Sequence, residues 1–194
     1  RLREKGITVD IDLNEGLFRF PEHVLFASGE YNLNANGIRA ITDLGTIMSK
    51  RLPCYSGPRG AGPPAACDRP ELHKPGKFDV ILIEGHTDAM RVLPGHRLDD
   101  NLQLSVFRSW ETYNTLVKSW SDNGSDITGL KNADGQYLIG VSGYGENRAI
   151  PDKENKMNMA EVMARNRRID FRIVLAAPEP SAGLIVRQEA QAPR

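Results

Sequence analysis

The sequence lacks a long apolar run, has little cysteine and has no excess of charge of either sign. No stretch approaches the run of about 18 apolar residues that a membrane-spanning helix needs, so no part of the chain is expected to cross a membrane. Lys plus Arg and Asp plus Glu number 25 each, which gives a formal net charge of zero. Because domains that coat nucleic acid are usually strongly basic, this balance argues against nucleic acid as a partner.

A secretory signal and an initiating methionine are also missing, since the chain begins at Arg1. We therefore expect a mature product or a segment of a longer protein, with any membrane anchor upstream. The 194 residues are 40% hydrophobic and 26% charged, which is typical of one globular domain with tails or an insertion. A chain of this length can bury a core without a structural metal.

The two cysteines, Cys54 and Cys67, lie in a stretch rich in proline and glycine that runs from Pro53 to Pro75. A disulfide between them would close a loop of about 14 residues and stabilise the fold by roughly 3 kcal/mol. A metal site is disfavoured because two thiolates lack the other two ligands of a tetrahedral site, and two free thiols are the remaining alternative. A disulfide would imply an oxidising compartment such as the periplasm.

Hydrophobic periodicity predicts strands and helices that alternate along the chain. The predicted strands cover residues 7–13, 17–20, 78–85, 137–142 and 169–175, and the predicted helices cover 35–51, 102–120 and 157–165. Asn34 is the expected N-cap of the first helix, and Pro53 ends it. This order indicates an α/β sandwich with helices packed on a mixed sheet. We expect a leader over 1–16, one domain over 17–177 with an insertion at 53–77, and a loose tail over 178–194.

The helix predicted for 102–120 carries an apolar stripe, which favours packing in the core over a platform for stacking bases. The stripe consists of Leu102, Val106, Trp110, Tyr113, Val117 and Trp120. Asn101, Leu104 and Arg108 share a different face of the same helix. Arg108 is therefore expected to project toward one end of the sheet.

Four short polar motifs follow the predicted strands or open the predicted helices. They are Gly-His-Thr-Asp at 85–88, Asn-Leu-Gln-Leu-Ser-Val-Phe-Arg at 101–108, Gly-Tyr-Gly-Glu at 143–146 and Asn-Arg-Arg at 166–168. Polar side chains at the end of a core strand are well placed to meet a ligand. Each motif is weak alone, but all four in this order are specific.

Together the motifs resemble those of the OmpA-like peptidoglycan-binding family, over about residues 17 to 175. The resemblance implies non-catalytic binding of the peptide stem of peptidoglycan, without a cofactor. By this resemblance, Asp88 would bind the ammonium group of a diaminopimelate side chain, and Arg108 would bind its carboxylate. A zwitterionic head group needs one anion and one planar cationic fork, which agrees with these two residue types.

The resemblance also implies supporting roles for other residues. Thr87, Asn101 and Leu104 would contact or orient the ligand, and Arg167 and Arg168 would bind nearby carboxylates or hold the frame of the site. The sequence departs from the family pattern in the longer loop from Ala89 to Asp100, in the 53–77 insertion, and in Ser109 and Trp110 after the helix arginine. These departures bear on affinity more than on fold.

Two other functions remain open at this stage. A metal hydrolase could use His86, Asp88 and His96, but no general base accompanies them, and we expect His86 to be bonded to the backbone. A protein-interaction module on the same fold, without wall binding, is the other alternative. For Asp88 and Arg108 themselves, a structural ion pair or a loop cap is the simpler interpretation.

The leader and the segment 132–136 resemble MotB-type stator proteins more than small lipoproteins. That resemblance implies a periplasmic domain of a protein anchored in the inner membrane, acting as a homodimer with a membrane-embedded partner subunit. The stator-like subunit of Zorya anti-phage defence systems follows the same plan. Motility, defence and envelope integrity are not distinguished by the residues.

Overall fold

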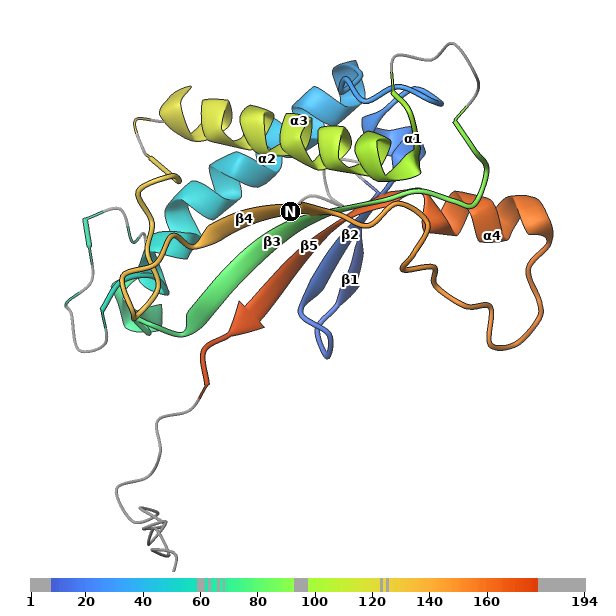
Figure 1. The fold of residues 1–194 in the computed structure, drawn as a ribbon. Helices are drawn as coiled ribbons and strands as arrows, with labels where there is room; N and C mark the ends of the chain where they lie inside the picture. Colours follow the sequence, from blue (N-terminus) through green and yellow to red (C-terminus); the bar gives the residue numbers. More distant parts are fainter. Residues whose placement is uncertain are drawn as a thin grey trace, which may run out of the picture.

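The computed structural model describes residues 8–58, 62, 64, 65, 67, 69–92, 98–122, 124 and 126–177 (Figure 1). The strands are β1 (Asp10–Asp12), β2 (Leu17–Pro21), β3 (Phe78–His86), β4 (Ile139–Gly143) and β5 (Arg168–Leu175). The helices are α1 (Glu22–Leu25), α2 (Ala35–Arg51), α3 (Asn101–Asp122) and α4 (Met159–Asn166), with 3-10 turns at Leu52–Cys54 and Pro70–Leu72. None of the described helices is both long enough and apolar enough to cross a membrane.

The five strands form one mixed sheet in the order β1-β2-β5-β3-β4. β3 and β4 are parallel, and the other neighbours are antiparallel. α2 and α3 lie together on one face of the sheet, and α4 lies beyond its end (Figure 1). The predicted mixed α/β architecture is confirmed. Among the described residues, no helix packs on the opposite face, which carries loops and polar side chains.

The hydrophobic core lies between the sheet and the two helices. Alternate residues of the central strands point into it, because successive side chains of a strand face opposite sides. Ile81 and Ile83 come from β3, and Ile169 and Phe171 come from β5; all four are at most 2% exposed. Trp120 of α3, the largest fully buried side chain among the described residues, belongs to the same cluster. These contacts fix the end of β3, where the polar motifs begin.

The first long helix begins and ends where the sequence predicts. Asn34 adopts an extended backbone, and its side-chain oxygen accepts a hydrogen bond of 2.8 Å from the Gly37 amide. This cap satisfies one of the free amides at the start of α2. The helix ends at Arg51, and Pro53 lies in the short 3-10 turn that follows.

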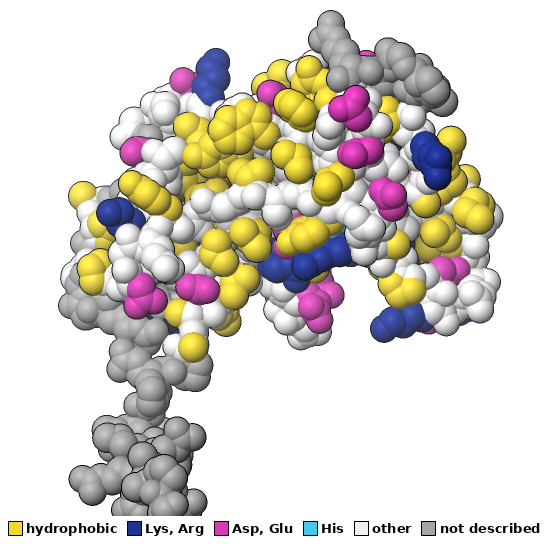
Figure 2. Space-filling view, viewed as in Figure 1, with side chains coloured by type: hydrophobic (Ala, Val, Ile, Leu, Met, Phe, Trp, Pro, Cys, Tyr) yellow, Lys and Arg dark blue, Asp and Glu magenta, His cyan; other side chains and the backbone are white. Residues whose placement is uncertain are grey.

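The prediction for the apolar stripe of α3 is wrong in its first half. Leu102, Val106 and Trp110 are 43–48% exposed, and only the second half of the stripe (Tyr113, Val117 and Trp120) packs on the core. Figure 2 shows hydrophobic side chains gathered on the surface over α3. The buried face instead carries small polar residues, which let the helix approach the strands closely. Ser109 Oγ, for example, donates to the Ser142 carbonyl at 2.8 Å.

Two strand predictions also need correction. The strand expected to be half-buried over 7–13 is a three-residue exposed edge strand, in which Ile11 is 43% exposed. Val9 is buried beside it, and Ile7 lies outside the described residues. β5 buries both faces of its first half, because Arg168 and Asp170 are covered and paired with other charged side chains. An edge strand needs few apolar contacts, and buried charges need partners, which periodicity alone does not reveal.

The predicted disulfide between Cys54 and Cys67 is confirmed. Their Cα atoms are 4.8 Å apart, and both residues are buried. Replacing both cysteines by serine is expected to lower the free energy of unfolding by about 3 kcal/mol, because the unfolded chain regains the freedom of the closed loop. Urea unfolding of the double variant, and of the wild type with and without a reductant, measures this loss. Equal midpoints would show that the disulfide contributes nothing to stability.

Candidate functional site

Three of the four motifs meet where β3 ends. The Tyr144 amide donates to the Gly85 carbonyl at 3.0 Å, and the Thr87 amide donates to the Gly145 carbonyl at 2.9 Å. Ser105 of α3 accepts a hydrogen bond of 2.9 Å on its Oγ from the Gly145 amide. These bonds tie the residues after β3 to the turn after β4 and to the first turns of α3.

Beside this junction lies a cavity of about 230 Å³. Six of the residues that the sequence singles out line it: Thr87, Asp88, Asn101, Leu104, Arg108 and Arg167. Asp88 and Arg108 share the cavity without bonding each other directly, although 20 positions separate them in the sequence. The structure therefore brings the predicted acid and the predicted guanidinium to one small space.

An alternating chain of four charges runs along this cavity. Arg108 Nη2 donates to Glu22 Oε1, and Arg167 Nε donates to Glu22 Oε2 at 2.5 Å. Arg167 Nη1 then donates to Asp88 Oδ2 at 2.6 Å. Two guanidiniums and two carboxylates balance, so the network can be buried without a net charge. It holds both arginines in fixed positions at the cavity wall.

Arg108 is further fixed by groups from the segment after α1. Its Nε donates to the Glu30 carbonyl at 2.9 Å, and its guanidinium lies 5.1 Å from the centre of the Phe26 ring. Burial lowers the pKa of Arg108 below its ordinary value, while the charge of Glu22 acts in the opposite direction. An arginine stays protonated under such a shift, so Arg108 presents a permanent positive charge. Its Nη1 has no hydrogen-bond partner among the described residues.

Arg167 shows the opposite balance. Burial would lower its pKa, but its hydrogen bonds and charge contacts with Asp88 and Glu22 outweigh burial and raise the pKa above the ordinary value. Its guanidinium is thus firmly bound as a bridge between the two carboxylates. Arg167 is better described as the holder of Asp88 and Glu22 than as a free ligand contact.

Asn101 and Thr87 differ in how they meet the cavity. Asn101 Nδ2 donates to the carbonyls of Asp88 (3.2 Å) and Met90 (2.9 Å), and so holds the loop that carries Asp88. Thr87 Oγ1 is buried and has no hydrogen-bond partner among the described residues. A buried hydroxyl usually has a partner, so this oxygen is available to a ligand in the cavity.

Sequence reasoning missed Glu22, the residue that joins the two arginines. Its carboxylate is almost fully buried, and its own amide donates to the Arg167 carbonyl at 2.9 Å. Its only signal in the sequence is an acid directly after Pro21, at the end of a predicted strand. Such an acid is usually a solvated residue, and only the fold brings it next to Arg108 and Arg167.

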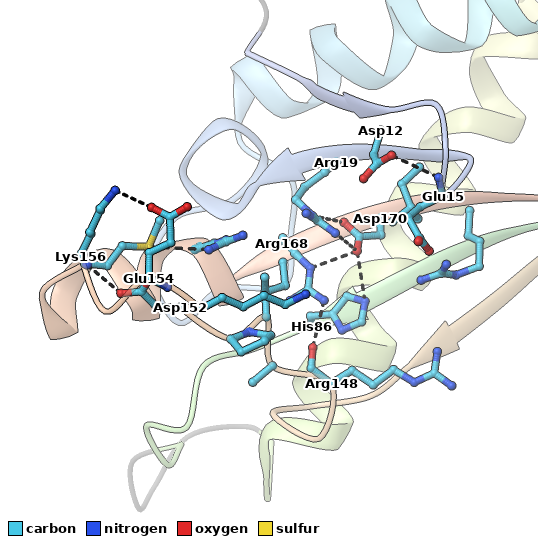
Figure 3. Close-up of a pocket in the computed structure, with 18 residues that line it drawn as sticks. Asp12, Glu15, Arg19, His86, Arg148, Asp152, Glu154, Lys156, Arg168 and Asp170 are labelled. Carbon is cyan, nitrogen blue, oxygen red and sulfur yellow. Dashed lines mark hydrogen bonds and ion pairs between the residues drawn. The ribbon is translucent and has the colours of Figure 1, made fainter.

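Arg168 does not reach this cavity. It points to the opposite face of the sheet, where its Nε donates to Asp170 Oδ2 at 3.0 Å and its Nη2 donates to the Arg148 carbonyl at 3.0 Å. Arg167 ends α4 and Arg168 begins β5, and the two side chains line different cavities, so they do not serve one site. Arg168 lines a second cavity, shown in Figure 3.

His86 was expected to be bonded to the backbone, and this expectation is wrong. The side chain is 1% exposed, and neither ring nitrogen has a hydrogen-bond partner among the described residues. It lines the second cavity and stacks on Tyr144, whereas Asp88 lines the first. The alternative of a metal hydrolase used His86, Asp88 and His96 as ligands. His86 and Asp88 line different cavities, and His96 lies outside the described residues.

Burial and the charge of Arg168 lower the pKa of His86 from 6.5 to about 3, and Arg19 and Arg148 contribute while Asp170 opposes them. Between these values the unfolded chain takes up a proton at His86 and the folded chain does not, so acidification destabilises the fold. We expect His86 alone to account for a loss of about 2 kcal/mol between pH 7 and pH 5. In His86→Phe, which can still stack on Tyr144, urea unfolding at the two pH values should show a difference smaller by that amount. An unchanged difference would show that His86 does not titrate in this way.

The comparisons with known proteins agree with the geometry at the level of the fold. No protein-family model matches the chain, and no curated protein sequence matches it. Solved structures do: a MotB-like protein from Desulfovibrio vulgaris has a TM-score of 0.58 at 21% identity, covering 90% of this chain and 85% of that one. The periplasmic domain of Helicobacter pylori MotB has a TM-score of 0.54 at 15% identity, covering 87% and 82%.

A third similar structure is the cell wall anchor of the type VI secretion system from Pseudomonas aeruginosa. Its TM-score is 0.55 at 15% identity, and the match covers 90% of this chain and 92% of that one. These matches span most of both partners. The chain therefore has the fold of OmpA-like, MotB-type domains, as its four motifs indicate.

Proposed function

We propose that this domain, with the fold of the MotB-type domains, binds the peptide stem of peptidoglycan and catalyses nothing. The observation that carries the proposal is the shared cavity of Asp88 and Arg108. An anion and a guanidinium fixed at one small cavity suit the zwitterionic end of a diaminopimelate side chain. The cell wall anchor among the similar structures supports the same role.

In the proposed complex, Asp88 accepts hydrogen bonds from the ligand ammonium. The ligand carboxylate meets Arg108 through Nη1, the nitrogen without a partner among the described residues. Thr87 Oγ1 supplies a further hydrogen bond, and Leu104 contacts the aliphatic part of the ligand. Asn101 and Arg167 act indirectly, because they hold the loop and the carboxylate of Asp88.

The wider setting of this binding is also a proposal. The domain would lie in the periplasm and hold an inner-membrane complex, such as an ion-driven stator, to the wall as a homodimer with a membrane-embedded partner subunit. The MotB-like and MotB periplasmic domains among the similar structures support this setting. The buried disulfide suits an oxidising compartment.

The proposal is tested with stem peptides that differ only at the residue recognised. The wild-type domain should bind a diaminopimelate peptide and purified sacculi, and should bind the matched lysine peptide at least about tenfold more weakly. The lysine peptide keeps the ammonium but lacks the carboxylate for Arg108, and a charge-assisted hydrogen bond contributes about 1.5–3 kcal/mol. Equal binding of both peptides by calorimetry would contradict the role of Arg108.

Asp88→Asn is expected to weaken binding of the diaminopimelate peptide by at least about thirtyfold, because truncating a charged hydrogen-bond partner costs about 2–5 kcal/mol. Asp79→Asn, which changes a carboxylate on β3 away from the cavity, is the control and should bind like the wild type. Sacculus binding that persists in both Asp88→Ala and Arg108→Ala would remove the site assignment. A wild-type domain that binds no sacculi would favour a protein-interaction module.

A further inference from the structure

The sheet face opposite α2 and α3 carries a second cavity, of about 830 Å³. The β1–β2 hairpin, β3, β5 and the loop 148–157 surround it (Figure 3). We propose that this cavity binds one oxyanion, a carboxylate or phosphate group of a small ligand, on Arg148, Arg172 and His86. The proposal is independent of peptidoglycan binding, since the two cavities lie on opposite faces of the sheet.

The first argument is charge. Asp170 accepts two hydrogen bonds from Arg19, at 2.8 and 3.0 Å, and one from Arg168 at 3.0 Å. Glu84 is held by Arg172, whose Nε lies 3.1 and 3.0 Å from the two carboxylate oxygens, and Arg148 Nη1 lies 3.8 Å away. Four guanidiniums thus surround two carboxylates, an excess of two positive charges. A concave site with such an excess attracts anions.

The second argument is that two of these guanidiniums keep free donors. Arg172 uses only its Nε toward Glu84, and its two terminal nitrogens have no partner among the described residues. Arg148 lies 3.8 Å from the centre of the Tyr144 ring, and its side chain is 52% exposed. Both line the cavity, and a guanidinium fork matches the geometry of a carboxylate or phosphate.

The third argument is His86, a buried polar side chain without a partner. Its Nε2 lies 3.7 Å from Asp170 Oδ2 and 4.0 Å from Glu84 Oε2, beyond hydrogen-bond distance. Because burial keeps the ring neutral at pH 7, one of its nitrogens carries a proton to donate. A buried donor without a partner is rare, and an oxyanion in the cavity would accept the hydrogen bond that the His86 N–H group can donate.

A metal ion fits the same place less well. Glu84, His86 and Asp170 offer ligand atoms that all lie within 4.8 Å of one another, a spacing that a cation could use. The four guanidiniums already neutralise both carboxylates, however, so a divalent cation would meet an excess of positive charge. At the rim, acidic side chains (Asp12, Glu15, Asp152 and Glu154) slightly outnumber basic ones (Lys153, Lys156 and Arg165), and Lys156 is paired with Glu154. The rim therefore adds no positive charge to that of the four guanidiniums, which favours a single oxyanion over a polyanion.

The test is a titration of the whole domain with inorganic phosphate and with acetate, in chloride of constant ionic strength. We expect saturable NMR shifts of the His86 ring nitrogens and of the Arg172 Nε–H group. Saturation with phosphate alone identifies a phosphate ligand, and saturation with acetate alone a carboxylate. No saturable shift with either anion, or shifts that appear only when Zn²⁺ is added, would overturn the proposal.

Two variants make the assignment specific. Arg148→Gln should weaken anion binding about tenfold, because it removes one charged donor worth about 1.5–3 kcal/mol, and its exposure means that folding should persist. Arg39→Gln, which changes an exposed arginine on α2, should bind like the wild type. Asp88→Asn should also bind the anion normally, which separates this site from the peptidoglycan cavity. Equal binding by Arg148→Gln and the wild type would contradict the proposed site.

Discussion

Arg108→Met is expected to reduce binding of the diaminopimelate peptide by at least about thirtyfold, since truncating a buried, charged hydrogen-bond partner costs about 2–5 kcal/mol. The same change should lower the free energy of unfolding by about 3 kcal/mol, because Glu22 loses one of its two guanidinium partners while it remains buried. Calorimetry with the peptide measures the first effect, and urea unfolding measures the second. A variant that binds like the wild type would show that Arg108 serves the fold alone.

A double variant separates these two effects. Arg108→Met combined with Glu22→Gln leaves no unpaired charge at this position, and the glutamine oxygen can still accept the hydrogen bond from Arg167. Stability should return toward the wild-type value, while peptide binding should stay lost because the guanidinium is missing. If binding returned together with stability, Arg108 would be a structural partner of Glu22 and not a ligand contact.

The second large effect concerns Gly85, in the first polar motif. A Cβ added there would lie 2.0 Å from the Ser105 carbonyl oxygen and 2.8 Å from its carbonyl carbon. These are backbone atoms of α3, so no side-chain rotation relieves the clash, and the helix would have to move away from β3. Gly85→Ala is therefore expected to lower the free energy of unfolding by about 3 kcal/mol, the upper end of the usual cost of overpacking, because the clash is with backbone atoms.

Thermal and urea unfolding check this prediction. Gly62→Ala is the matched control, because a Cβ there meets nothing within 4 Å, and its stability should stay close to that of the wild type. Any folded fraction of Gly85→Ala should also bind the stem peptide poorly, since Asp88 closely follows β3 and Arg108 lies on α3, the two elements forced apart. Similar stability of the two variants would contradict the close packing of β3 on α3.

The glycine also shows why α3 was difficult to predict. The sequence shows where this helix lies, because its apolar residues recur at helical spacing. Periodicity assigns the larger apolar side chains to the buried face, and for Trp110 this is wrong. The close approach at Gly85 requires small residues on the buried face, and this requirement arises only when strand and helix meet.

The residues of the candidate site likewise fall into those that the sequence could predict and those that only the structure revealed. Thr87, Asp88, Asn101 and Arg108 could be named from their motifs, because each stands directly after a predicted strand or in the first turns of a predicted helix. Glu22 could not be named, since it is distant in sequence from both of its arginines. Arg167 and Arg168 were equivalent in the sequence, and only the junction of α4 with β5 in the folded chain sends them to two different cavities.

The sequence alone determined the order of the five strands and the three longer helices, the N-cap at Asn34, the disulfide and the motif residues at the ends of the elements. These features depend on periodicity, backbone preference and short-range spacing, which act between neighbours in the chain. Only the tertiary structure decided that Glu22 joins Arg108 to Arg167, and that His86 and Asp170 are buried among guanidiniums on the other face. Buried charges need partners from distant segments, and those partners are brought together only when the whole sheet has formed.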